Sequence, residues 1–188
     1  MITAAAYDIH VEQLFEKLRR FHGALDAAAI PYQLVGGLGI FLHVSERDPT
    51  AARLTNDVDV AVDRADLPRI VKAAESAGFR FRHVAGVDML LDALQPKAHS
   101  AVHMVFIREK VRPEYLEPVP DFAAPVKTSE GILIASVASL VKMKLTSFRL
   151  KDKVHLQDLD HVGLITPEIE ATLSEPLRAR LAEVRATE

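Results

Sequence analysis

Residues 32–62 constrain this chain more than any other stretch, because they join two short apolar runs through a glycine-rich turn. Residues 32–35 predict a strand, and residues 36–39 (Gly-Gly-Leu-Gly) predict a turn that enters a short buried helix. A strand that ends in a glycine turn and a helix start leaves backbone N–H groups free to hold phosphate oxygens. The first half of the stretch therefore predicts an anion site, although two adjacent glycines also occur in ordinary turns.

Two aspartates stand on the second predicted strand of this stretch. Side chains alternate along a strand, so Asp57 and Asp59 point to one face while Val58 and Val60 point to the other. Two carboxylates about 5 Å apart repel each other by roughly 3 kcal/mol at an effective dielectric near 20, and a bound divalent cation removes that repulsion. A phosphate site beside such a pair predicts chemistry on a nucleoside triphosphate. The alternative is an edge strand with its polar face in water.

Composition limits the classes of partner. The 188 residues are 49% hydrophobic, which is enough for one packed domain of ordinary size. A net charge of −3 and an aromatic content of 6% argue against bulk DNA binding. Cysteine is absent, which excludes disulfides and thiolate zinc sites. The N-terminal residues lack the pattern of a signal peptide, so we expect a cytoplasmic protein without membrane attachment.

Elsewhere the chain alternates helical and extended patterns, which predicts an α+β fold: a mixed sheet flanked by helices, with a C-terminal helical subdomain. We place an α/β core at residues 1–125 and a mainly helical part at residues 126–188. Residues 87–94 are ambiguous between strand and short helix. Residues 111–125 hold four prolines and predict an extended crossing or a linker.

The order of these motifs resembles the nucleotidyltransferase superfamily, which includes DNA polymerase β-like enzymes, minimal nucleotidyltransferases and abortive-infection type IV toxins. The resemblance covers residues 30–162 and rests on a double-glycine turn, an Arg-x-Thr-x-Asp-x-Asp strand motif and a later basic helix. The matching residues are Gly36, Gly37, Arg53, Thr55, Asp57, Asp59, Lys144, Arg149, Lys151, Asp152 and Asp158.

The resemblance implies a role for each group of residues. Asp57 and Asp59 would hold Mg²⁺, and Gly36 and Gly37 would contact the phosphates. The nucleotide-binding set would also include Arg53, Thr55 and Lys144. We expect Lys144 to be a surface side chain whose ammonium faces the triphosphate, although a basic helix is often just a solvated surface.

One departure from the family pattern concerns the third acid, which the superfamily carries on a later strand. His103 occupies that strand here. A neutral histidine can ligate a metal or act as a base, but it does not supply the missing negative charge. His103 is therefore either a catalytic substitute or a rim residue in a site without full activity. Asp88 is a weaker candidate for the missing acid.

These observations predict a Mg²⁺-dependent nucleotidyltransferase that moves a nucleoside monophosphate from an NTP to an acceptor. The acceptor can be an RNA end, a protein hydroxyl or a small molecule. A toxin with a separate antitoxin partner is a further possibility that the sequence leaves open. The alternative from another class is a nucleotide-binding or partner-binding protein that keeps the fold and has lost catalysis.

Overall fold

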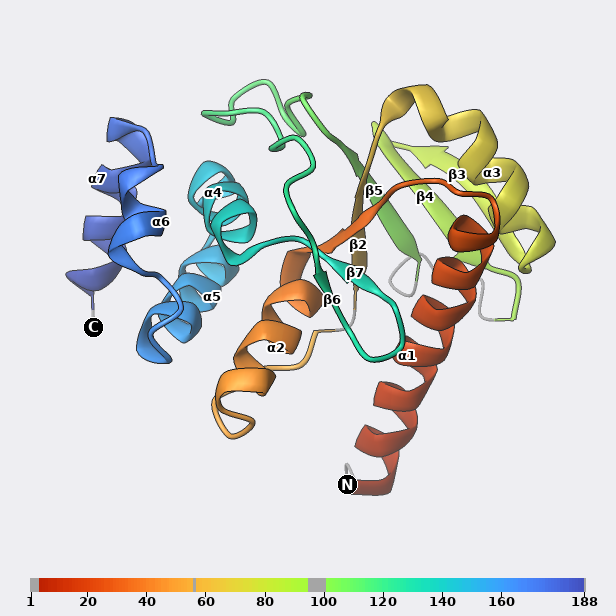
Figure 1. The fold of residues 1–188 in the computed structure, drawn as a ribbon, viewed down its shortest axis with the longest axis horizontal. Helices are drawn as coiled ribbons and strands as arrows, with labels where there is room; N and C mark the ends of the chain where they lie inside the picture. The colour runs from red at the N-terminus through yellow and green to blue at the C-terminus, as the bar shows by residue number, and fades with distance from the viewer. Residues whose placement is uncertain (1–3, 56, 95–100, 188) are drawn as a thin grey trace.

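The computed structural model describes residues 4–55, 57–94 and 101–187, and it shows one mixed sheet with helices packed against it (Figure 1). Among the described residues, no helix is both long and apolar enough to span a membrane. The helices are α1 (Ala4–Ala27), α2 (Gly36–Arg47), α3 (Leu67–Ser76), α4 (Val137–Ser147), α5 (Leu150–His161), α6 (Pro167–Ala171) and α7 (Glu175–Arg185), with the 3-10 turn η1 (Arg64–Asp66) before α3.

The sheet has its strands in the order β3-β4-β5-β2-β1-β7-β6. Their bounds are β1 (Gln33–Val35), β2 (Val58–Val62), β3 (Phe79–Val84), β4 (Val87–Asp92), β5 (Val102–Phe106), β6 (Val126–Lys127) and β7 (Leu133–Ile134). The central strand β2 runs antiparallel to β1 and parallel to β5. This register places Asp59 between Val35 on one side and His103 on the other.

Two hydrophobic cores cover the two faces of the sheet. Side-chain alternation along β2 sends its valines into the first core and leaves Asp57 and Asp59 on the opposite face. The first core packs α1 and α3 on the sheet and includes Leu18, Phe21, Ile70, Val58, Val60 and Val102. The second packs α4, α5 and α7 on the other face and includes Leu140, Leu145, Leu156, Leu177, Val35 and Ala61. The carboxylate pair therefore lies on the side of the sheet that faces α4.

The α+β architecture predicted from the sequence is confirmed, and the structure settles the segments that were ambiguous. Val87–Asp92, most of the ambiguous segment 87–94, forms the strand β4, which pairs with β3 and β5. The part of the chain after residue 125 is mainly helical, but it first adds β6 and β7 to one end of the sheet. The left-handed residue Phe148 caps the C-terminus of α4, and Arg149 is the N-cap of α5, which begins at Leu150.

Candidate active site

The glycine turn joins β1 directly to α2. Gly36 has a φ of +67°, a conformation that favours glycine, and a Cβ at this position would collide with the carboxylate of Asp59. Val35 stands at the N-cap of α2 and gives no side-chain cap to the helix. The first backbone N–H groups of α2 therefore lie beside Asp59 without a cap from the Val35 side chain, in the arrangement that suits an anion.

The two aspartates face a large cavity on the α4 side of the sheet. Asp57 and Asp59 both line this cavity, which has a volume of about 630 Å³, and the side chain of Asp59 is 33% exposed. The lining also includes Gly36, the β3–β4 turn at Ala85, Gly86 and Val87, His103 on β5, the loop residues Pro113, Tyr115 and Pro118, and Met143, Lys144, Arg149 and Lys151 of α4 and α5.

His103 lies beside Asp59, as its strand position predicted. It is the direct neighbour of Asp59 in the β2–β5 register, and its Nδ1 lies 3.7 Å from the Oδ1 of Asp59. That distance is longer than a hydrogen bond but within reach of an ion pair when the imidazole is protonated. Its side chain is 23% exposed and lines the cavity. The residue that replaces the third acid therefore has access to whatever the two carboxylates bind.

Asp88 lies elsewhere, which corrects its candidacy as the missing acid. It pairs in register with Met104, whose side chain belongs to the core on the other face of the sheet. Its carboxylate accepts a hydrogen bond from Nδ1 of His83 at 2.6 Å and lies 3.6 Å from the guanidinium of Arg64. Strand alternation puts Asp88 on the face opposite His103, so its charge is satisfied away from the cavity.

Lys144 is buried, contrary to the expectation of a surface side chain. It lines the cavity but is only 6% exposed, and its Nζ donates to Asp152 at 2.9 Å. Arg149 and Ser147 donate to the same carboxylate, which is fully buried. Burial alone would raise the pKa of Asp152, but the hydrogen bonds from Arg149 and the charge of Lys144 outweigh it and hold that pKa below its usual range. The Lys144 ammonium is therefore paired with Asp152.

The remaining predicted binding residues pack behind the glycine turn. A Cβ at Gly37 would come within 3.0 Å of the Thr55 side chain and 3.3 Å of the His155 ring, so a glycine is needed for this packing. Arg53 is exposed and its Nε donates to Asp158 at 2.9 Å, which ties the segment before β2 to α5. Gly37, Arg53 and Thr55 are absent from the cavity lining of the described residues, and their contact with a nucleotide stays a prediction.

His155 is a residue that the sequence reasoning missed. Burial, reinforced by the charge of Lys144, lowers its pKa to about 4. Its Nδ1 is buried and has no hydrogen-bond partner within the described part of the chain. Its only signal in the sequence is its place on α5 one turn after Asp152, among residues that otherwise match the family motif.

Across residues 4–55, 57–94 and 101–187, no group of three or more histidine, aspartate or glutamate side chains is arranged to hold a metal ion. Mg²⁺ is usually held by one or two carboxylates while substrate phosphates and water complete its octahedron. The residues present fit that case, because Asp57 and Asp59 share a cavity with the uncapped start of α2.

No protein-family model matches this chain, and no curated protein matches it in sequence. Solved structures do match. The solution structure of the antibiotic-resistance factor ANT(2'')-Ia is 13% identical with a TM-score of 0.56, over 94% of this chain and 95% of that one. The crystal structure of ANT(2'')-Ia with adenylyl-2''-tobramycin is 12% identical with a TM-score of 0.44, over 89% and 94%. The Megavirus polyadenylate synthase is 7% identical with a TM-score of 0.37, over 92% and 34%.

The first of these likenesses extends over nearly the full length of both chains and establishes the fold. The protein therefore shares the fold of ANT(2'')-Ia, and the nucleotidyltransferase-like fold that its motifs predicted is confirmed. At this identity the likeness says nothing about individual site residues, whose roles rest on their own geometry.

Proposed function

We propose that this protein is a Mg²⁺-dependent nucleotidyltransferase that moves a nucleoside monophosphate from an NTP to a hydroxyl acceptor. One observation carries the proposal: Asp57 and Asp59 face a cavity of about 630 Å³ beside the uncapped N-terminus of α2 at Gly36. A carboxylate pair and the first backbone N–H groups of α2 lie close together there, and phosphoryl transfer needs positioning and charge neutralisation more than covalent participation. The fold shared with ANT(2'')-Ia supports the same class of activity.

In this proposal Asp57 and Asp59 hold Mg²⁺ together with the phosphates of the substrate. When bound, the ion supplies charge neutralisation and polarises the phosphate oxygens. The N–H groups at the start of α2 bind phosphate oxygens, and Lys151 lines the same cavity, as does Arg149, whose guanidinium also donates to Asp152. The role predicted for Lys144 becomes indirect, because its ammonium donates a hydrogen bond to Asp152. Its charge contributes to the electrostatic potential in the cavity, and it does not contact the triphosphate.

The reaction then proceeds by in-line displacement at the α-phosphorus. The acceptor hydroxyl oxygen forms a bond to that phosphorus, the bond to the bridging β-phosphate oxygen breaks, and pyrophosphate leaves. In this proposal His103 takes the hydroxyl proton, and its position on the cavity wall, 3.7 Å from Asp59, supports that role. His103→Ala should then lower the transfer rate by roughly a hundredfold or more.

The second candidate is a nucleotide-binding protein with a weakened active site. It is favoured by the charge at the site, where His103 stands next to Asp59 in place of a third carboxylate. Under this reading the parent binds an NTP and transfers nothing, and His103→Asp gains activity because it adds the missing charge. Transfer by the parent that survives His103→Ala would contradict both candidates for His103.

An antitoxin partner stays a prediction from the family resemblance.

The experiment is calorimetry with the four NTPs, with and without Mg²⁺. We expect binding that strengthens markedly when Mg²⁺ is present and that is lost in Asp59→Asn. Asp26→Asn, an exposed aspartate on α1, is the matched control and should bind as the parent does. Equal NTP affinity with and without Mg²⁺, or no binding at millimolar NTP, would overturn the proposal.

A further inference from the structure

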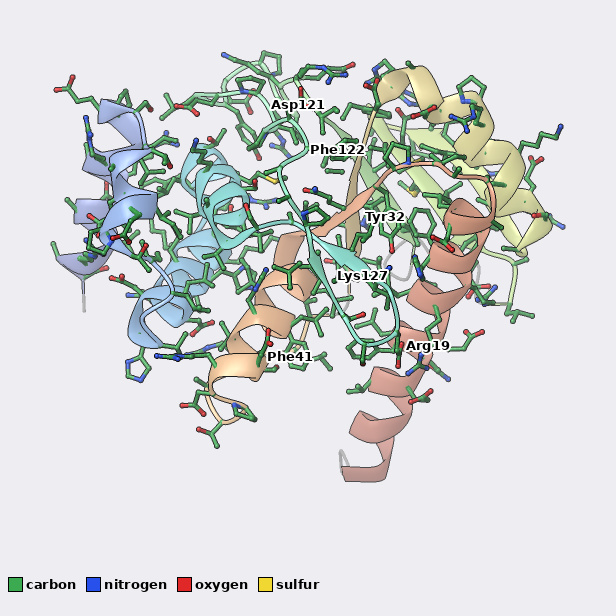
Figure 2. The ribbon with its side chains drawn as sticks, in the orientation of Figure 1. Arg19, Tyr32, Phe41, Asp121, Phe122 and Lys127 are labelled. Atoms are coloured by element: carbon green, nitrogen blue, oxygen red, sulfur yellow. The ribbon has the colours of Figure 1, made fainter. Side chains whose placement is uncertain are left out.

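A loop that closes on itself roofs the cavity. This roof loop (residues 109–119) leaves β5 and returns to it, because the Arg108 N–H donates to the Val119 carbonyl at 2.8 Å. The guanidinium of Arg108 pairs with Asp63 and with Asp121 at 2.9 Å, so both ends of the loop are fixed to the end of β2. Figure 2 labels Asp121 where the chain leaves the loop. The roof is therefore anchored at its root.

The roof loop lies above α4 in the view of Figure 1, and residues of both segments line the cavity. Pro113, Tyr115 and Pro118 line the cavity from the loop, and Met143 lines it from α4. The Tyr115 N–H donates to the Arg112 carbonyl at 3.1 Å, which closes a turn and presents the partly buried ring of Tyr115 to the cavity. Two prolines stiffen the segment on either side of that ring. These four residues line a largely apolar slot beneath the loop, and the charged residues Arg112 and Glu117 of the same loop also line the cavity.

The other parts of the cavity are already assigned in the proposed reaction. In that reaction the phosphates bind between Gly36 and the aspartates, and the acceptor approaches His103, whose strand β5 pairs with β4. The slot beneath the roof loop remains for the base. Among the described residues that line the cavity, Tyr115 carries the only six-membered aromatic ring. Stacking of a base on such a ring is worth roughly fivefold to a hundredfold in affinity.

We propose that Tyr115 stacks on the base of the bound NTP and that Pro113 and Met143 form the other walls of the base site. This inference rests on the proposed function, because it assumes that the phosphates bind at the aspartates. Every nucleobase has a π-face, so all four NTPs should depend on Tyr115. Tyr115 is then a base-binding residue on a segment outside the family motifs. It gives the protein a higher affinity for nucleotides than for inorganic polyphosphates.

The test compares the Kd values of NTPs and of inorganic triphosphate, in Mg²⁺, for Tyr115→Ala and Tyr115→Phe. Tyr115→Ala should raise the Kd for each NTP at least fivefold and leave that for triphosphate unchanged, whereas Tyr115→Phe keeps both. The matched control is Leu116→Ala, which removes an exposed neighbour on the same loop that is absent from the cavity lining. The chain has three tyrosines and no tryptophan, so an NTP should also quench tyrosine fluorescence in the parent and much less in Tyr115→Phe.

Three outcomes would overturn the inference. Unchanged NTP affinity in Tyr115→Ala would show that Tyr115 does not stack on the base, and it would leave the proposed function intact. An equal loss of NTP and triphosphate affinity would show that Tyr115 only shapes the roof loop. A parent that binds neither NTP nor triphosphate would overturn the proposed function, and the base site with it.

Discussion

Two carboxylate sites of this protein look alike in sequence and differ in the structure. Asp152 is fully buried and receives hydrogen bonds from Lys144, Arg149 and Ser147, so its charge is balanced inside the protein. Asp59 is 33% exposed, faces a cavity and has the start of α2 packed against it. Both stand in segments that resemble motifs of the nucleotidyltransferase superfamily. The residues around Asp152 hold α4 and α5 together, whereas the carboxylate of Asp59 stays accessible from the cavity.

The largest effect is expected from removing the buried charge. Asp152→Asn leaves Lys144 buried beside a neutral partner, so it should lower the free energy of unfolding by about 3–5 kcal/mol. Asp59→Asn removes a carboxylate from a cavity wall and should change that free energy by less than about 0.5 kcal/mol. Urea denaturation of the two variants measures both values. Equal losses would show that the two sites do not differ in the way described.

His155 should make stability depend on pH. Its pKa is about 4 in the folded protein and about 6.5 in an unfolded chain, so the unfolded state binds more protons between these values. Stability should therefore rise with pH through this window, by about 3 kcal/mol in all, and be complete above pH 6.5. Denaturation at pH 4.5 and pH 7 should show this difference in the parent and a smaller one in His155→Gln. An identical pH dependence in the parent and in His155→Gln would contradict the burial of a neutral His155 imidazole against Gly37.

The smallest effect concerns the ion pair between Arg53 and Asp158. The side chain of Arg53 is 68% exposed. A double-mutant cycle of Arg53→Ala and Asp158→Asn should therefore give a coupling of about 0.2–1 kcal/mol in the free energy of unfolding. If the pair only positions the segment before β2, the two single variants should weaken NTP binding equally. A greater loss in Arg53→Ala than in Asp158→Asn would instead support the direct nucleotide contact predicted from the sequence.

The sequence predicts the site best where the determinants are local. The turn at Gly36 and the alternation of Asp57 and Asp59 follow from a few adjacent residues, and the structure places all three around one cavity. The orientation of His103 follows in the same way from alternation along β5.

The burial of Lys144 depends instead on how α5 folds back after Phe148, whose left-handed conformation no helical periodicity predicts. The face taken by Asp88 depends on the register between β4 and β5, which the ambiguous pattern of residues 87–94 did not fix. Tyr115 stands in a proline-rich crossing without any periodic pattern, and only the closure of the loop at Arg108 brings it over the cavity.

The most direct test of the central claim is the transfer of label from NTPs labelled at the α-phosphate. The purified parent would be incubated with Mg²⁺ and separated RNA, protein and small-molecule fractions of a cell extract. We expect Mg²⁺-dependent label in one fraction, and a loss of at least about a thousandfold when Asp57→Asn and Asp59→Asn are combined. Label that persists in the double variant, or a parent that labels no fraction with any of the four NTPs, would contradict it.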